Sequence, residues 1–158
     1  MFRQFMDALY RCGLRTVYWM LRGWWFLRRP FHEGVLVGVW QGPRVLLVRT
    51  SYHGWFGLAG GSRRRNESIE EAAVRELAEE LGMYVDPDQL SYRCSIEHST
   101  EHRRENLPFF EVELSQDVAV HIDNREIVWA EFVTVDEALQ LNLFPPVRQY
   151  LQQRAAKA

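Results

Sequence analysis

The sequence is poor in cysteine. Its two cysteines, Cys12 and Cys94, form no CxxC pattern and no Cys/His cluster. A disulfide framework and a structural zinc site both need such patterns, so the sequence predicts neither. A chain with so little cysteine is typical of a reducing compartment, and we expect a cytoplasmic protein.

A long apolar run is also missing. The most apolar stretch lies within residues 2–29, where arginine interrupts it too often for a transmembrane helix. No small-residue cleavage pattern is present, which argues against a signal peptide. The net charge is only −2 and the pI about 6.2, which is not the balance of a nucleic-acid-binding protein. The 158 residues, 47% of them hydrophobic, predict a globular chain with a substantial core.

Charge is unevenly distributed along the chain. Residues 1–29 hold six arginines and one aspartate, a net charge of +5, which leaves −7 for the remainder. Arginines recur here at helical spacing opposite an apolar, tryptophan-rich side, so residues 2–29 predict an amphipathic helix that ends at Pro30. We favour packing of its apolar side against the chain's own domain or against a second subunit in a homodimer. The alternative is contact with an anionic membrane surface.

The rest of the sequence alternates strand and helix patterns irregularly. Apolar, β-branched runs predict strands at residues 35–40, 44–50, 91–98, 108–114 and 126–133. Helices are predicted at residues 68–81, 136–141 and 146–156. Segments 51–61 and 98–106 are interpreted as loops. This order predicts an α/β (α+β) fold in which helices lie on both faces of a mixed β-sheet.

Three glutamates crowd onto one arc of the helix predicted at residues 68–81. At about 100° per residue, Glu76, Glu79 and Glu80 lie side by side, next to an apolar stripe. Like charges at this spacing repel, so the arrangement costs helix stability unless something offsets it. A hard divalent cation, Mg²⁺ or Mn²⁺, prefers such oxygen ligands and leaves room for a substrate phosphate. The alternative interpretation is a solvated helix face rich in glutamate and alanine.

A longer pattern contains these glutamates. Residues 61–83 agree at every defined position with the Nudix box, GX5EX7REUXEEXGU, where U is a bulky aliphatic residue. The chain therefore resembles the Nudix hydrolase family, with the Nudix domain expected over residues 31–158 and a helical arm over residues 1–30. Two departures, Ala59 where the family usually has proline and Asn66 where it commonly has glycine, remove no carboxylate.

The resemblance implies a role for each residue of the box. The acids that would bind the metal and activate the attacking water are Glu76, Glu79 and Glu80. The Gly61 carbonyl would be a further ligand, Arg75 would orient the glutamates, and Glu67 would hold Arg75 or another metal. Our candidate for an additional acid outside the box is Glu126. The alternatives are a structural role for Glu126, with the extra acid supplied by Glu105, Glu111 or Glu113.

The resemblance also implies a reaction, hydrolysis of the pyrophosphate bond of a nucleoside diphosphate linked to another group. Marks of ADP-ribose, dinucleoside-polyphosphate, NADH and coenzyme A hydrolases are absent downstream of the box, which favours nucleoside triphosphates or nucleotide sugars. The candidate substrate-binding residues are Trp55, which would stack on a base, and Arg63, Arg103 and Arg104, which would contact phosphate. The alternatives are core packing for Trp55 and solvated loops for the three arginines.

Two other functions compete with the soluble hydrolase. One is a Nudix-fold nucleotide-binding or regulatory module without catalysis, and the intact box argues against it because such modules typically have a broken one. The other is a Nudix hydrolase that associates with a membrane surface through residues 2–29.

Overall fold

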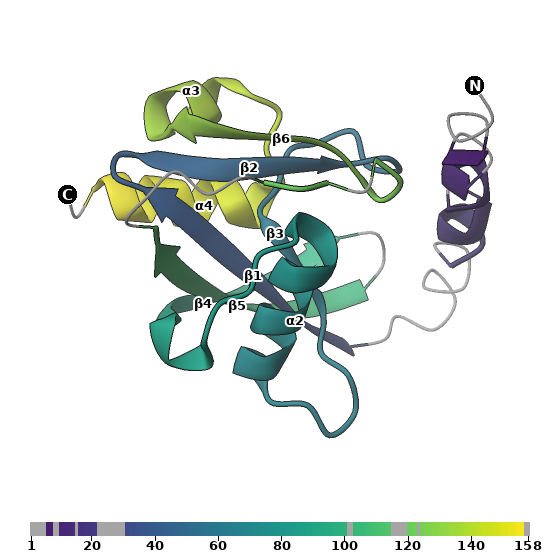
Figure 1. Cartoon of the computed structure of the whole chain (residues 1–158), viewed down its shortest axis with the longest axis horizontal. Coiled ribbons are helices and arrows are strands. Elements are labelled where there is room, and N and C mark those ends of the chain that lie inside the picture. The colour runs from purple at the N-terminus through teal and green to yellow at the C-terminus, as the bar shows by residue number, and fades with distance from the viewer. Residues whose placement is uncertain are drawn as a thin grey trace.

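The computed structural model describes residues 6–7, 10–14, 16–21, 31–100, 103–114, 120–122 and 124–156. For residues 31, 32, 100, 103 and 104 it describes the backbone alone. The described strands form one mixed sheet (Figure 1): β1 (Phe31–Gln41), β2 (Arg44–Thr50), β3 (Ala59–Ser62), β4 (Ser91–Thr100), β5 (Arg103–Glu113) and β6 (Ile127–Thr134). The strand order is β4-β5-β1-β2-β6, with β3 paired to β1. Only the β1–β5 pairing is parallel among these described strands.

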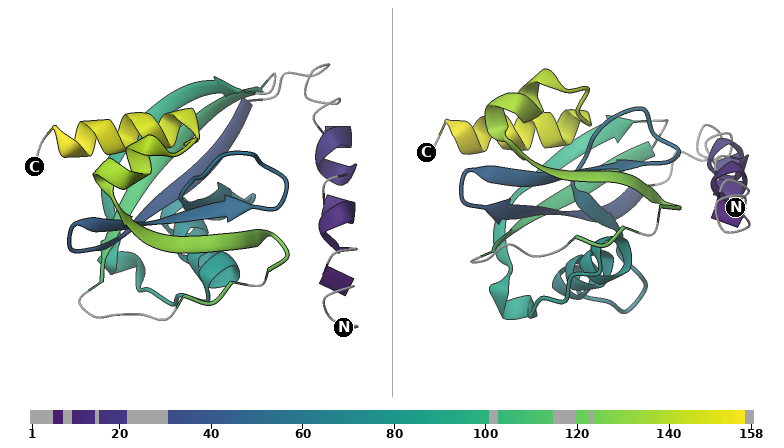
Figure 2. Two further views of the ribbon diagram at one scale, coloured as in Figure 1. Left: turned by 90° about the horizontal axis from the view of Figure 1, so that it is seen from above. Right: turned by 45° about the horizontal axis from the view of Figure 1, so that its top comes forward.

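Helices cover both faces of this sheet. They are α2 (Ile69–Leu81), the short 3-10 helix η1 (Pro87–Gln89), α3 (Val135–Gln140) and α4 (Pro145–Ala155). Figure 2 shows α2 on one side of the strands and α3 and α4 on the other. The predicted α+β architecture, a mixed sheet sandwiched between helices, is therefore confirmed.

Successive side chains of β1 point to opposite faces of the sheet and so contribute to two separate core clusters. Val35, Val37 and Val39 are buried in the apolar cluster that includes the inner side of α2. Trp40 points to the opposite face and donates a hydrogen bond from Nε1 to the Tyr150 hydroxyl of α4 at 2.9 Å. β1, at the centre of the sheet, therefore packs against α2 on one face and α4 on the other.

Local chemistry sets the ends of α2. The Ser68 side chain accepts a hydrogen bond from the backbone N–H of Glu71, and the Glu71 carboxylate accepts one from the N–H of Ser68, which completes a capping box. Gly82 ends the helix in the left-handed conformation with φ 64°. Asn66, in the loop before the helix, also has a positive φ of 68°, as its tolerance of this conformation predicts.

Two segments predicted as loops contain strand. Residues 59–62 form β3, because Gly60 adopts φ +150° and a Cβ there would lie 2.0 Å from the Val35 carbonyl oxygen of β1. Only glycine at position 60 lets β3 pair with β1 at this distance. In the polar segment 98–106, β4 continues to Thr100 and β5 begins at Arg103, so the loop there is much shorter than predicted. Cross-strand pairing with β4 stabilises this hairpin despite its polar composition.

The described residues at the N-terminus are helical, at residues 6–7, 10–14 and 16–21, and we call them the N-terminal helix. It stands beside the end of the sheet where β2 leads into its following loop and β6 begins (Figure 2). Asp7 forms an ion pair with Arg125 at 3.1 Å, and Tyr18 contacts the rings of Tyr52 and His53. Within the described residues, no helix has both the length and the hydrophobicity that crossing a membrane requires.

Candidate active site on helix α2

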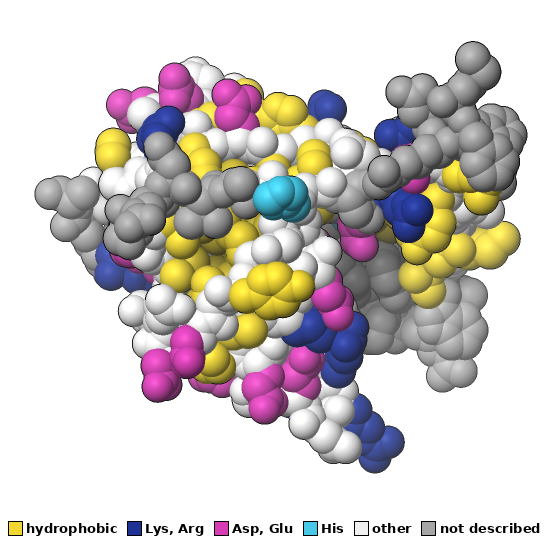
Figure 3. Space-filling view, in the orientation of Figure 1, with side chains coloured by type: hydrophobic (Ala, Val, Ile, Leu, Met, Phe, Trp, Pro, Cys, Tyr) yellow, Lys and Arg dark blue, Asp and Glu magenta, His cyan; other side chains and the backbone are white. Residues whose placement is uncertain are grey.

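Arg75 is the centre of the charged cluster on α2. Its guanidinium donates to Glu67 at 2.7 Å, to Glu76 at 2.7 Å and to Glu79 at 3.2 Å, and its side chain is only 15% exposed. Helical spacing alone predicts an outward-facing Arg75, but the structure contradicts this, because Glu67, from the loop before the helix, draws the guanidinium inward. Figure 3 shows basic and acidic side chains alternating over α2 and this loop.

Glu67 and Arg75 form the tightest pair in the cluster. Hydrogen bonds from the Arg75 side chain and from the backbone N–H of Arg64 lower the pKa of Glu67 to about 2. The same bond to Glu67 raises the pKa of Arg75. The guanidinium also reaches the Ser62 carbonyl at 3.0 Å, so it connects α2 to the end of β3. Both groups stay charged over the whole physiological pH range.

Glu76 is largely enclosed. Its side chain is 13% exposed, and burial raises its pKa although Arg75 opposes the shift. It packs against the glycine turn of the box: a Cβ on Gly61 would lie 2.5 Å from its Oε1. Glycine at position 61 therefore keeps the space in which this carboxylate sits.

Glu80 and Glu126 meet at the edge of a cavity. The backbone N–H of Gly60 donates to Glu80 Oε2 at 3.0 Å, and the Tyr52 hydroxyl donates to Glu126 Oε1 at 2.6 Å. Burial, then Glu126 and the negative charges of Glu80 and Glu76, raise the pKa of Tyr52, so its hydroxyl stays protonated as a donor. The Tyr52 hydroxyl thus bonds Glu126, just before β6, and feels the negative charge of two carboxylates of α2.

Glu79 is the most exposed of the three predicted acids of α2. It is 50% exposed and bonded by Arg64 at 3.0 Å as well as by Arg75. Within the described residues, no three His, Cys, Asp or Glu side chains stand in a ready metal-binding arrangement. Glu76, Glu79, Glu80 and Glu126 are instead each hydrogen-bonded to a protein donor.

The donor chemistry nevertheless fits a hard divalent cation. The groups that surround the Gly60-Gly61 turn are carboxylate and carbonyl oxygens, which Mg²⁺ and Mn²⁺ prefer. The missing Cβ of Gly61 leaves backbone and carboxylate in direct proximity. Nitrogen or sulfur ligands are not needed to complete such a site.

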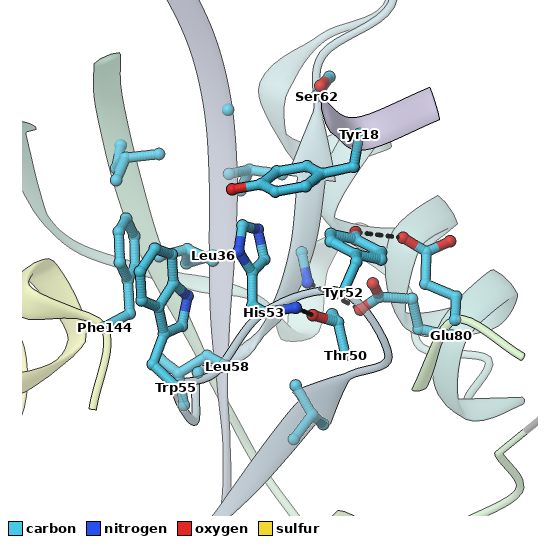
Figure 4. Close-up of a pocket in the computed structure, with 18 of the residues that line it drawn as sticks. Tyr18, Leu36, Thr50, Tyr52, His53, Trp55, Leu58, Ser62, Glu80 and Phe144 are labelled. Atoms are coloured by element: carbon cyan, nitrogen blue, oxygen red, sulfur yellow. Dashed lines mark hydrogen bonds between the residues drawn. The ribbon is translucent and has the colours of Figure 1, made fainter. Parts of the chain in front are cut away.

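The cavity beside these acids has a volume of about 460 Å³, in the range of small-molecule sites. Glu80 and Glu126 line it together with Gly60 and Gly61. The wall of the cavity also includes aromatic rings from several segments: Tyr18, Tyr52, His53, Trp55 and Phe144. Among these rings His53 stacks on Trp55 at 4.6 Å between ring centroids, and Trp55 stacks on Phe144 at 5.6 Å (Figure 4).

The predicted substrate-binding residues are placed differently from one another. Trp55 lies in the cavity wall, while its neighbour Phe56 packs in the core against Trp129. Arg63 forms an ion pair with Glu33 at 2.6 Å on the surface. The side chains of Arg103 and Arg104 lie outside the described residues.

The candidate extra acids separate into two groups. Glu126 and the 4%-exposed Glu105 both line the cavity. Glu111 and Glu113 instead bond Arg154 of α4, and Glu111 also accepts a hydrogen bond from Tyr150 at 2.8 Å. The latter two belong to a structural network on the other face of the sheet, which removes them as candidates for the site.

Sequence reasoning missed several cavity residues: Tyr18, Tyr52, His53 and Phe144. Tyr52 and His53 belong to an aromatic, glycine-rich segment that signals a loop but no particular contact. Phe144 precedes two prolines that begin α4, and an isolated β-bridge between Phe56 and Leu143 brings that segment to the cavity. These contacts depend on long-range packing that no local pattern records.

Comparison with protein-family models gives one match, the NUDIX domain, over residues 30–153. That span is most of the chain and includes the cavity's acidic edge. No curated protein matches the sequence at a significant level.

Solved structures give the same fold. A MutT NUDIX hydrolase from Burkholderia pseudomallei superposes with a TM-score of 0.70 at 21% identity, covering 78% of this chain and 98% of its own. The NUDIX domain of Shewanella oneidensis NrtR, complexed with ADP ribose, gives 0.69 at 20% identity, covering 81% and 88%. The E. coli dihydroneopterin triphosphate pyrophosphohydrolase gives 0.69 at 20% identity, covering 80% and 96%.

Proposed function

Because this chain belongs to the Nudix hydrolase family, whose members act on phosphoric anhydride bonds, we propose that it is a metal-dependent pyrophosphohydrolase of nucleoside diphosphate derivatives. Nucleoside triphosphates and nucleotide sugars are the substrate classes we favour. The observation that carries the proposal is the joint placement of Glu80, Glu126 and the Gly60-Gly61 turn at one edge of a cavity with an aromatic wall.

The oxygen atoms at this edge would hold the metal, Mg²⁺ or Mn²⁺. We assign Glu76, Glu80 and Glu126 and the Gly61 carbonyl to it, with Glu79 joining from the outer side of α2. When bound, such an ion neutralises phosphate oxygens and lowers the pKa of the attacking water.

The chain's own residues preorganise these ligands. Arg75 holds Glu76, the Gly60 N–H holds Glu80, and the Tyr52 hydroxyl holds Glu126, each through a hydrogen bond of 2.6–3.0 Å. Groups fixed in this way before substrate arrives reduce the entropy lost on reaching the reactive geometry. Glu67 extends the support by fixing Arg75.

The aromatic wall supports a substrate with a planar ring. Phosphates at the acidic edge would leave the rest of a nucleotide against the aromatic rings of Tyr52, His53 and Trp55. Two of the similar structures have names that point the same way, one complexed with ADP ribose and one named for dihydroneopterin triphosphate. This agreement supports a nucleotide-like ligand without selecting its base.

A product screen tests the proposal. The purified protein would be incubated with Mg²⁺ or Mn²⁺ and a panel of nucleoside triphosphates, oxidised nucleotides, nucleotide sugars, ADP-ribose and dinucleoside polyphosphates. Glu80→Gln should nearly abolish turnover but keep the fold, because a glutamine oxygen still accepts the Gly60 N–H. Glu70→Gln makes the same chemical change on an exposed position of α2 and should keep wild-type turnover.

The outcomes separate the enzyme from the binding module. Cleavage of one substrate class by wild type and Glu70→Gln, but not by Glu80→Gln, supports the proposed reaction and site. No cleavage of any panel member with either metal contradicts it and favours a nucleotide-binding module. Equal rates for Glu80→Gln and wild type would refute the role of this acid.

A further inference from the structure

One face of the N-terminal helix borders the substrate cavity. Four of its residues line the cavity, and their spacing of three, one and three places them on a single helical stripe: Leu14, Val17, Tyr18 and Leu21. The neighbouring Trp19 and Met20 point elsewhere, with 63% and 70% of their surface exposed. The helix is therefore oriented, with a defined side toward the cavity.

Polar contacts attach this helix to the segment that carries Glu126. Asp7 pairs with Arg125 at 3.1 Å, Arg11 donates to the Asn124 carbonyl at 3.4 Å, and the Arg125 guanidinium lies 5.3 Å from the centre of the Tyr10 ring. Each exposed contact is weak by itself. Together they hold the helix next to an acid of the proposed metal site.

Tyr18 is the residue through which the helix reaches the site. Its ring lies 5.0 Å from the His53 ring at an interplanar angle of 81°, and 5.5 Å from the Tyr52 ring at 33°. Figure 4 shows it over His53, on the side of the cavity opposite Leu58, with Tyr52 between it and the acidic edge. Tyr52 in turn donates to Glu126.

The cavity side of the helix still has apolar surface for a ligand to cover. Val17 is 54% and Leu21 is 44% exposed although both border the cavity. Rings and branched aliphatic side chains around an open slot suit a flat heterocycle, since stacking covers both kinds of surface and tolerates different bases. A phosphate or a sugar ring gains little from such a wall.

We propose that the N-terminal helix is part of the substrate site and that Tyr18 is a substrate-binding residue which contacts the planar heterocycle of the substrate. The proposal rests on the proposed function for the position of the phosphates, at the Glu80 and Glu126 edge. It assigns the recognition of the ring to a segment that precedes the Nudix domain match at residues 30–153.

The test compares Tyr18→Ala, Tyr18→Phe and Met20→Ala in the full-length protein. Met20→Ala is the matched control, because it truncates a large side chain of the same helix on its exposed side. For the best substrate of the panel, Tyr18→Ala should raise KM about 10-fold or more, the scale of one lost base–aromatic stack. Tyr18→Phe keeps the ring and should stay within about twofold of wild type, as should Met20→Ala.

A second substrate separates ring contact from general damage. Inorganic tripolyphosphate carries the anhydride bonds without a heterocycle, so any hydrolysis of it should be equal in Tyr18→Ala and wild type. A Tyr18→Ala variant with wild-type KM for the nucleotide would overturn the proposal. So would an equal loss on nucleotide and tripolyphosphate.

Binding without turnover keeps the two proposals distinguishable. Titration calorimetry of a non-hydrolysable nucleoside triphosphate against the same variants gives Kd whether or not the protein hydrolyses anything. A Kd raised about 10-fold in Tyr18→Ala alone supports the role of Tyr18 even if the panel shows no cleavage. An unchanged Kd beside active hydrolysis refutes the role of Tyr18 and leaves the proposed function intact.

Discussion

A methyl group on Gly61 tests whether the position of the Glu76 carboxylate matters. In the structure an added Cβ would lie 2.5 Å from Oε1, 2.7 Å from Cδ and 2.9 Å from Oε2 of Glu76, whereas ordinary contacts begin at 3.4 Å. The carboxylate must therefore retreat by about 0.9 Å, the difference between 3.4 and 2.5 Å. Because this side chain is 13% exposed and bonded to Arg75 at 2.7 Å, we expect a shift of that size to disturb the bond.

The expected consequence of Gly61→Ala is a loss of function with little loss of fold. A displacement of about 1 Å at a catalytic group costs roughly 100-fold in rate, so kcat/KM for the panel's best substrate should fall about 100-fold. The free energy of unfolding should fall by about 1 kcal/mol, as for an ordinary substitution, because the group that must move is the end of a side chain. Urea unfolding and Mn²⁺ binding by electron paramagnetic resonance complete the assay.

Two neighbouring glycines provide the controls. A Cβ on Gly54 would have no atom within 4 Å, so Gly54→Ala should have wild-type kcat/KM, Mn²⁺ affinity and urea unfolding. Gly60→Ala should unfold at a markedly lower urea concentration, because its Cβ would meet the Val35 carbonyl oxygen at 2.0 Å and force β1 and β3 apart. A Gly61→Ala protein with wild-type kcat/KM and Mn²⁺ affinity would refute the reasoning that places Glu76 in the site.

Three further predictions concern the side-chain networks. Glu67→Gln should lower the Tm at neutral pH, measured by circular dichroism. Because folding lowers the pKa of Glu67 from 4.5 to about 2, the difference in Tm between wild type and variant should be largest above pH 4.5 and should shrink as the pH falls toward 2. Arg75→Lys should lower kcat about 10- to 100-fold in steady-state assays, because an ammonium cannot bridge the acids that the planar guanidinium holds. Tyr150→Phe should cost ~1–3 kcal/mol in urea unfolding with unchanged kcat, because it leaves the buried Trp40 Nε1 without its acceptor and removes one of the hydrogen bonds of Glu111, on the face away from the cavity.

The parts of the fold that follow local rules were predictable from the sequence. The strand at residues 44–50 and the helix capped at Ser68 and Gly82 have the predicted extents within a residue, because their apolar period and end signals agree. β3 was not predictable, since Ala-Gly-Gly-Ser has neither β-branched nor aromatic residues. It is a strand only because it pairs with β1, at a distance that requires glycine at position 60.

The site divides in the same way. Spacing alone places Glu76 and Glu80 on neighbouring positions of α2, and the structure keeps them near the Gly60-Gly61 turn. Spacing says nothing about the inward turn of Arg75, which depends on Glu67, or about the bond from Tyr52 to Glu126 across 74 positions of sequence. Box residues are thus predictable in identity and place, but their hydrogen-bond partners are set by tertiary packing.

The N-terminal helix shows why an amphipathic pattern predicts a helix but not its partner. An apolar stripe with arginines opposite is satisfied equally by the chain's own domain, by a second subunit or by an anionic membrane surface. In the described residues, two separate contacts favour the chain's own domain as the partner. The ion pair of Asp7 with Arg125 fixes one end of the helix, and the ring contact of Tyr18 with His53 fixes the rotation of the helix about its axis. A helix held at both points must turn Leu14, Val17 and Leu21 toward the cavity, because these residues share the stripe of Tyr18. The stripe that reads as a general apolar surface in the sequence is therefore, in the folded chain, a wall of the candidate active site.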